Sequence, residues 1–147
     1  MIKVAVMGYG TIGSGVAEIL DQNRDVIAGQ AGQDVELKYV LDLRDFPDSP
    51  YRDCFVKDFG VIESDPEVDI VVETIGGATV ALDFTTRALK AGKSVVSSNK
   101  ELVATHGAEL LAIARRRGVC FLFEASVGGG TPIITPMHQC MAANVIS

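Results

Sequence analysis

Three glycines near the start of the chain stand at a spacing that suits anion binding. Gly8, Gly10 and Gly13 follow an apolar run at residues 2–7 and precede residues 14–20, whose apolar side chains recur at helical spacing. A strand that turns sharply into a helix places backbone N–H groups at the helix N-terminus, where they bind phosphate oxygens. Gly8 suits the tight turn, Gly10 lets phosphate approach the backbone, and Gly13 lets the helix pack closely on the strand. The pattern predicts a dinucleotide diphosphate site rather than a glycine-rich turn without a ligand.

Two charged residues follow the next predicted strand, at residues 35–41. Asp42 is placed to bind the adenosine ribose hydroxyls, as an acid at the end of the second strand does in dinucleotide-binding folds. Arg44, two residues later, is suited to a 2′-phosphate instead. The acid favours NAD and the arginine favours NADP, so the sequence leaves the choice open. A third interpretation is that Asp42 only begins a turn.

Lys100 lies in a polar stretch directly after a predicted strand at residues 93–97. Loops at the carboxyl ends of parallel strands line the crevice where ligands bind. In such a loop the Lys100 ammonium group can donate a proton or stabilise a polarised oxygen. The alternative is that Asn99 caps the next helix and Lys100 points into water. The spacing alone does not separate the two interpretations.

A further candidate site follows the predicted strand at residues 119–124. Residues 128–130 are consecutive glycines, which are costly to order and often mark close backbone approach to a ligand or ion. Glu124 is the acid nearest to them, and a carboxylate with backbone carbonyls suits a hard cation. A hinge between domains is compatible with the same pattern.

Strand and helix patterns alternate along most of the chain. We expect strands at residues 2–7, 35–41, 69–74, 93–97 and 119–124, with a weaker segment at 56–62. We expect helices after residue 13 and at 25–31, 81–91 and 109–117. In the helix at 81–91 the inward candidates are Leu82, Thr86, Leu89 and Ala91. Because parallel strands need crossovers, this order predicts an α/β fold of Rossmann type, with a doubly wound, mostly parallel sheet and helices on both faces.

Composition limits the class of protein and its partners. The chain has 147 residues, of which 48% are hydrophobic and 22% charged, as in a soluble globular domain. A net charge of −6 argues against a nucleic-acid partner, and the basic run at 115–117 is expected to be a solvated helix end. No apolar stretch has the length of a membrane span and no leader pattern opens the chain, so we expect no membrane partner and a cytoplasmic location.

The last residues begin a new pattern. Thr135-Pro136 is a good helix start, and apolar residues then recur on one face as far as Val145. A helix with one apolar face must bury it against another element. We therefore expect a dinucleotide-binding domain at residues 1–131 and the start of a truncated second domain at 132–147.

Four segments together resemble homoserine dehydrogenase. They are the glycine turn at 8–13 and the more specific segments at 72–77, 99–104 and 123–134. The resemblance covers the whole chain. It implies an oxidoreductase that interconverts L-aspartate 4-semialdehyde and L-homoserine with NADP or NAD, in the biosynthesis of threonine, methionine and isoleucine. This chain corresponds to the cofactor-binding part.

The resemblance also implies roles for individual residues. The diphosphate is expected at Gly10, Thr11 and Ile12. The nicotinamide side is expected to be lined by Thr74, Ile75, Gly76, Ser97 and Ser98. Lys100 matches the lysine at the hydride-transfer site, which is expected to bind cofactor or substrate and to assist proton transfer. A sodium-type cation site is matched by the Glu124 side chain and the backbone oxygens of Val127, Gly129 and Thr131.

We expect the family's substrate domain and most of its helical dimerisation region to be absent from these 147 residues. We expect the intact protein to act on a small-molecule substrate as a homo-oligomer, and the 147-residue chain to bind cofactor with little or no turnover. Two alternatives stay open. One is another two-domain amino-acid or semialdehyde dehydrogenase. The other is a non-catalytic nucleotide-sensing module, against which the reactive Lys100 argues.

Overall fold

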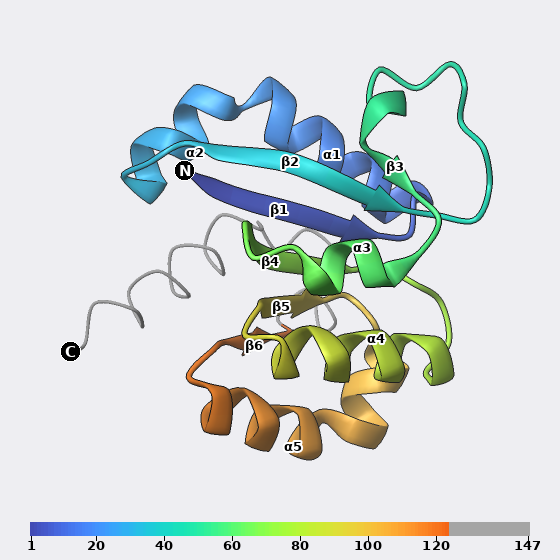
Figure 1. Cartoon of the computed structure of the whole chain (residues 1–147), viewed down its shortest axis with the longest axis vertical. Coiled ribbons are helices and arrows are strands. Elements are labelled where there is room, and N and C mark those ends of the chain that lie inside the picture. The colour runs from blue at the N-terminus through green and yellow to red at the C-terminus, as the bar shows by residue number, and fades with distance from the viewer. Residues whose placement is uncertain (124–147) are drawn as a thin grey trace.

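The computed structural model describes residues 1–123, in which six parallel strands form one sheet (Figure 1). The strands are β1 (Ile2–Met7), β2 (Val35–Leu41), β3 (Phe55–Val56), β4 (Val68–Glu73), β5 (Ser94–Ser97) and β6 (Phe121–Leu122). The helices are α1 (Thr11–Gln22), α2 (Arg24–Ala31), α3 (Phe59–Ser64), α4 (Thr79–Lys90) and α5 (Lys100–Arg117), with a 3₁₀ turn η1 (Arg52–Cys54).

The chain reverses direction across the sheet between β1 and β4. The strand order is β3-β2-β1-β4-β5-β6, so the chain first winds outward from β1 to β3, then returns to β4 and winds outward the other way. Ligands of open α/β sheets bind outside the carboxyl ends of the strands at this reversal. The glycine turn after β1 and the loop after β4 lie at that position. The predicted Rossmann-type fold is confirmed.

Helices cover both faces of the sheet because its strands are apolar on both sides. Along β1, Ile2, Val4 and Val6 belong to the buried cluster formed with α1 and α2. Ala5 and Met7 belong to the opposite cluster, formed with α3, α4 and α5. Each large side chain buried in this way stabilises the fold by about 1.5–3 kcal/mol. The two layers hold the carboxyl ends of β1, β4 and β5 in fixed relative positions.

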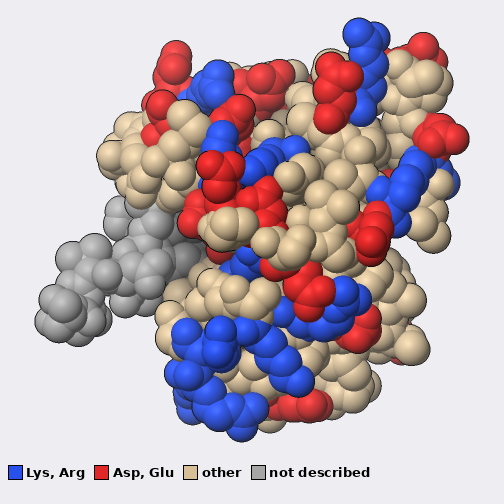
Figure 2. Space-filling model, viewed as in Figure 1, with Lys and Arg blue, Asp and Glu red and all other residues tan. Residues whose placement is uncertain are grey.

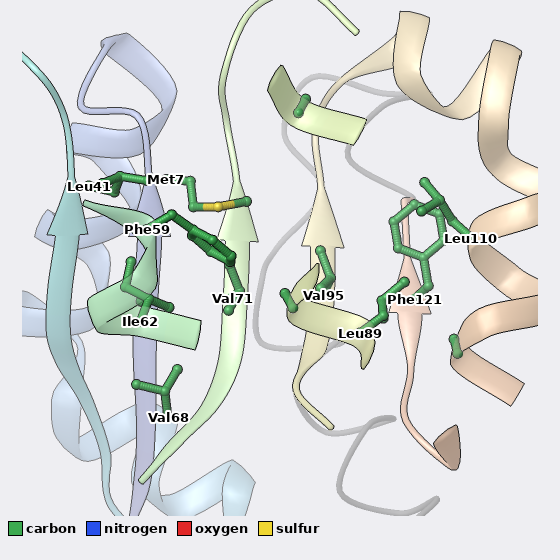
Figure 3. Packing of buried hydrophobic residues seen from close by; sticks show 14 of the residues in the cluster. Met7, Leu41, Phe59, Ile62, Val68, Val71, Leu89, Val95, Leu110 and Phe121 are labelled. Atoms are coloured by element: carbon green, nitrogen blue, oxygen red, sulfur yellow. The ribbon is translucent and has the colours of Figure 1, made fainter. Parts of the chain in front are cut away.

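Figure 3 shows the core on the side of α3, α4 and α5. Phe59 and Ile62 of α3 are buried in the same cluster as Met7 of β1. Further along the sheet, Leu110 of α5 lies beside Phe121 of β6 (Figure 3). The segment expected at 56–62 therefore contains both a short strand and a helix that closes this face.

The helix expected at 109–117 begins earlier, at Lys100. The Asn99 side chain caps it, because its Oδ1 accepts the backbone N–H of Leu102 at 3.0 Å. The sequence pattern did not indicate these first turns, because Thr105 and Gly107 have low helix propensity. The expected stop at Gly118 is confirmed, with φ +67 in the left-handed region.

Two further expectations about elements are wrong in part. In the helix expected at 81–91, Leu89 is fully buried and Leu82 packs against the core as expected, whereas Thr86 is only partly buried and Ala91 is exposed. The helix begins at Thr79, and its buried face also includes Thr85 and Ala88. The strand expected at 119–124 is shorter within the described residues, because only Phe121–Leu122 pairs with β5.

Charged side chains are distributed unevenly over the face in Figure 2. Cations gather over the C-terminal ends of α4 and α5, where the last turn of α5 carries three exposed arginines at 115–117. Cations are favoured there by the helix dipole, so the predicted solvated helix end is confirmed. None of the helices within residues 1–123 has the length and apolar character needed to cross a membrane.

Candidate dinucleotide-binding site

The glycine turn after β1 has the geometry that its spacing predicts. Gly8 has φ +92, and a Cβ there would approach the backbone oxygen of Thr74 to 3.1 Å. At Gly13 a Cβ would lie 1.8 Å from the backbone oxygen of Gly8, so only glycine lets α1 pack this closely. At Gly10, in contrast, a Cβ would meet no atom within 4 Å. The turn is closed toward the sheet and open toward the solvent at Gly10.

The N-terminus of α1 is free to bind an anion. Gly10 is its N-cap residue, and none of the side chains within residues 1–123 caps the helix. The backbone N–H groups of Thr11, Ile12 and Gly13 have no acceptor within the helix, because the first turn of an α-helix leaves its N–H groups unpaired. They carry the partial positive charge of the helix dipole. Together with the open space at Gly10, they fit a diphosphate.

A cleft of about 540 Å³ adjoins this turn at the carboxyl ends of β1, β2 and β4. It brings together seven of the predicted cofactor-binding residues, namely Gly8, Gly10, Asp42, Arg44, Thr74, Ile75 and Gly76. Leu43 and Val80 also line it and are 81% and 50% exposed. Apolar walls with a few polar groups are typical of ligand sites, and these two side chains suit the adenine ring of a dinucleotide.

Asp42 and Arg44 form an ion pair at the edge of the cleft. Arg44 donates Nε to Asp42 Oδ1 at 3.0 Å and Nη2 to Oδ2 at 2.9 Å. The backbone N–H groups of Arg44 and Tyr9 complete four hydrogen bonds to the same carboxylate. The Arg44 guanidinium, aided by these two N–H groups, holds the pKa of Asp42 far below its usual value. Since a carboxylate has about four lone-pair sites, Asp42 can bind ribose hydroxyls only if Arg44 moves away.

Tyr9 is a residue of the site that the sequence analysis did not single out. Its backbone N–H donates to Asp42 Oδ2 at 2.8 Å. Its ring packs edge-on against Phe46 and Phe55, with centroids 4.9 Å away in each case. The hydroxyl pairs with Ser49 Oγ at 3.0 Å. Tyr9 thus holds the loop after β2 against the glycine turn and fixes where Asp42 lies. Its position inside the G-x-G motif was the available signal.

The loop after β4 supports the glycine turn and then lines the cleft. The Thr74 hydroxyl donates to the backbone oxygens of Met7 at 2.8 Å and Gly8 at 3.0 Å, so it stabilises the turn directly. Ile75 is half-buried at the cleft wall, and its backbone N–H donates to the Glu73 carboxylate at 2.7 Å. Glu73 is fully buried and was not predicted as a site residue.

The end of β5 and the residues up to the start of α5 include three more predicted residues, none of which lines the described cleft. Ser97 is fully buried, and its hydroxyl donates to Glu73. Ser98 donates its backbone N–H to the backbone oxygen of Glu73 at 3.1 Å. Lys100 is exposed at the first position of α5, immediately after the capping Asn99. Contacts of these residues with a cofactor stay predictions.

The predicted cation site lies outside the described residues. This applies to Glu124, Val127, Gly129 and Thr131, and to the domain boundary predicted at residue 131. Within residues 1–123 no group of three or more His, Cys, Asp or Glu side chains is placed to hold a metal ion.

The site combines four features of a dinucleotide-binding domain. They are the Rossmann sheet, the open glycine turn, the uncapped N-terminus of α1 and the acid after β2. Comparison with known families agrees with this class. The model of the NAD-binding domain of homoserine dehydrogenase matches residues 8–124. The chain belongs to the homoserine dehydrogenase family and corresponds to the cofactor-binding part of these enzymes.

Relatives and solved structures agree with this assignment. The homoserine dehydrogenase of Pseudomonas aeruginosa is 38% identical over 99% of this chain, and that of Bacillus subtilis is also 38% identical over 99%. A crystal structure of S. aureus homoserine dehydrogenase at pH 8.5 superposes with a TM-score of 0.79 at 36% identity and covers 88% of this chain and 33% of that one. The chain spans 34% of the length of the two relatives.

Proposed function

We propose that this chain holds the nicotinamide cofactor of an enzyme that interconverts L-aspartate 4-semialdehyde and L-homoserine. The observation that carries the proposal is the family match across residues 8–124, which includes both the glycine turn and the segment around Lys100. The open cleft beside that turn supports it. The substrate itself would bind mainly to residues beyond the described part of the chain.

The cofactor is placed by the three loops of the site. The diphosphate binds the N–H groups at the start of α1, and the adenosine ribose lies at Asp42 and Arg44. The nicotinamide then extends toward the loops after β4 and β5, at Ile75 and Lys100. A bound reduced nicotinamide supplies the hydride that converts the aldehyde carbon into the carbon of a primary alcohol.

Lys100 supplies the proton in this proposal. As the hydride arrives at the aldehyde carbon, the carbonyl oxygen gains negative charge and accepts a proton from the Lys100 ammonium group. The position of Lys100 supports this role, because a cation in the first turn of a helix is disfavoured by about 0.3–1 kcal/mol. Because Lys100 destabilises the helix that it begins, its presence there is more readily explained by function than by helix stability.

The resemblance motivates two further proposals about the intact protein. It is a homo-oligomer, and it binds a monovalent cation of the sodium type at residues 124–131. Sedimentation equilibrium that gives a monomer would contradict the first. Equal turnover in sodium and in a bulky organic cation would contradict the second.

The test of the main proposal is turnover by the whole protein, with any residues that precede or follow these 147 included. Aspartate semialdehyde is reduced in the presence of NADPH or NADH, and the loss of reduced cofactor is followed by absorbance. We expect Lys100→Ala to lower kcat by roughly 10²–10⁴-fold, the usual contribution of a proton donor, with little change in cofactor affinity. The matched control is Lys90→Ala, an exposed lysine in the last turn of α4, which should behave as the wild type.

Two results would contradict the proposal separately. Absence of turnover by the wild type with either cofactor would reject the substrate assignment. Full activity of Lys100→Ala would reject its catalytic role and leave the substrate assignment standing.

A further inference from the structure

Glu73 places a carboxylate in the interior of the sheet, and no cation of residues 1–123 pairs with it. It is the last residue of β4, is fully buried, and is in register with Met7 of β1 and Ser97 of β5. None of the ion pairs within residues 1–123 includes it. Burial raises the pKa of Glu73, against the hydrogen bonds from Ser97 and Ile75. An apolar side chain of the same size would fill this place at lower cost, so a carboxylate here points to a role beyond packing.

The two carboxylate oxygens of Glu73 bind the loop after β4 and the end of β5. Oε1 accepts the backbone N–H of Ile75 at 2.7 Å, which fixes the loop after β4 at the wall of the cleft. Oε2 accepts the hydroxyl of Ser97 at 2.5 Å, at the end of the neighbouring strand β5. β4 and β5 lie side by side in the sheet (Figure 1). One side chain therefore connects the loop after β4 with the end of β5.

Asn99 closes these contacts into a ring. Ser97 Oγ accepts the backbone N–H of Asn99 at 3.1 Å, and Asn99 Nδ2 donates back to the backbone oxygens of Ile75 at 3.0 Å and Gly77 at 2.6 Å. Asn99 Oδ1 also caps α5, whose first residue is Lys100. The path from Glu73 to the start of α5 thus consists of hydrogen bonds to side chains and backbone in fixed elements.

We propose that Glu73 is a positioning residue for the nicotinamide side of the site, where its two hydrogen bonds fix the separation between Ile75 at the cleft wall and Lys100 at the start of α5. This inference rests on the proposed function of Lys100. It assigns Glu73 no contact with cofactor or substrate. Glu73 acts through Ile75 on one side and through Ser97 and Asn99 on the other.

The test compares binding of the nicotinamide half of the cofactor with binding of the adenosine half. ADP lacks the nicotinamide and uses only the glycine turn and the loop after β2, whereas NADPH uses both halves. The variants, made in the whole protein, are Glu73→Met, which removes both acceptors, and Glu73→Gln, which can still accept from Ile75 and bond to Ser97. Thr85→Val is the control, because Thr85 is another buried polar residue and its hydroxyl has no hydrogen-bond partner within residues 1–123.

For Glu73→Met we expect the Kd for ADP to stay within about twofold of wild type, while the Kd for NADPH rises about tenfold, as an unpaired buried N–H predicts. The kcat of this variant should fall by a larger factor than the factor by which its KM for the semialdehyde changes. Glu73→Gln should recover most of both losses, and Thr85→Val should match the wild type. Equal losses for ADP and NADPH, unchanged NADPH binding and turnover in Glu73→Met, or failure of Glu73→Gln to recover would each overturn the proposal.

Ser97→Ala gives a second test if Glu73→Met does not fold. It keeps the hydrogen bond to Ile75 and removes the connection to Asn99, so kcat should fall about tenfold while the affinity for ADP is unchanged. A kcat within twofold of wild type would overturn the proposal. If the wild type does not reduce the semialdehyde, the proposed function fails, and the comparison of NADPH with ADP in the Glu73 variants still decides whether Glu73 positions the cofactor loops.

Discussion

Replacing Gly10 by alanine should weaken cofactor binding without weakening the fold. Gly10 has φ −83, which alanine adopts freely, and its Cβ would meet no atom within 4 Å. Gly→Ala at such a position leaves the free energy of unfolding unchanged or raises it by about 0.4–1 kcal/mol. In the complex, the added methyl group would stand where the diphosphate approaches the backbone. Loss of one hydrogen bond to a charged group costs about 1.5–3 kcal/mol, which is a rise in Kd of roughly 10–150-fold.

Two other glycines of α1 provide the controls. A Cβ at Gly15 also meets no atom within 4 Å, but it lies further along the helix, so Gly15→Ala should bind cofactor as the wild type does. A Cβ at Gly13 would lie 1.8 Å from the backbone oxygen of Gly8, so Gly13→Ala should lower the free energy of unfolding by about 1–3 kcal/mol or more.

The assay combines calorimetric titration with NADPH and urea unfolding followed by circular dichroism. The expected pattern is that Gly10→Ala separates affinity from stability, whereas Gly13→Ala loses both. If Gly10→Ala binds NADPH as tightly as Gly15→Ala does, the diphosphate does not lie on this turn and the reasoning fails.

Three further predictions concern the cofactor's ribose and the stability of the fold. Arg44→Ala should raise the Kd for NADPH about tenfold and leave that for NADH equal or lower, since it frees Asp42 for ribose hydroxyls; equal loss for both in calorimetry would reject this role. Lys38, chiefly, lowers the pKa of Asp65 to about 2, so wild-type stability should fall as pH drops from about 4 toward 2. In urea titrations the free energy of unfolding of Asp65→Asn should fall by about 1 kcal/mol less than that of the wild type over that pH range. Equal falls in the two proteins would contradict this role of Asp65. Thr85→Val should raise the free energy of unfolding by about 1 kcal/mol, because it removes a buried hydroxyl without a partner within residues 1–123; a decrease would show an undetected partner.

The features that the sequence predicted best are those in which one residue type is required by local geometry. Gly8 and Gly13 are such cases, since positive φ at one and close packing at the other exclude a side chain. The strand at 35–41 was placed correctly for a similar reason, because its apolar pattern has clear polar ends. Asp42 follows directly from that strand.

The parts that the sequence did not predict depend on contacts between distant residues. The capping of α5 by Asn99 begins a helix whose first turns have poor propensity, and the buried Leu102 packs that first turn against the core. Glu73 was predicted only as part of an apolar strand. Its hydrogen-bond partner Ser97 is 24 residues away, so the local pattern does not reveal the contact. The ion pair between Asp42 and Arg44 was not predicted either. The two residues were considered only as alternative contacts of the adenosine ribose, and the structure shows that they bind each other.

The central claim is that the first N–H groups of α1 bind the cofactor's diphosphate. Hydrogen–deuterium exchange of the whole protein measures this directly, by following the peptide that covers residues 8–14 with and without saturating NADPH. We expect exchange at the start of α1 to slow markedly when the cofactor binds, because those N–H groups have no partner in the helix. Unchanged exchange in this peptide, under conditions in which NADPH is bound, would contradict the claim.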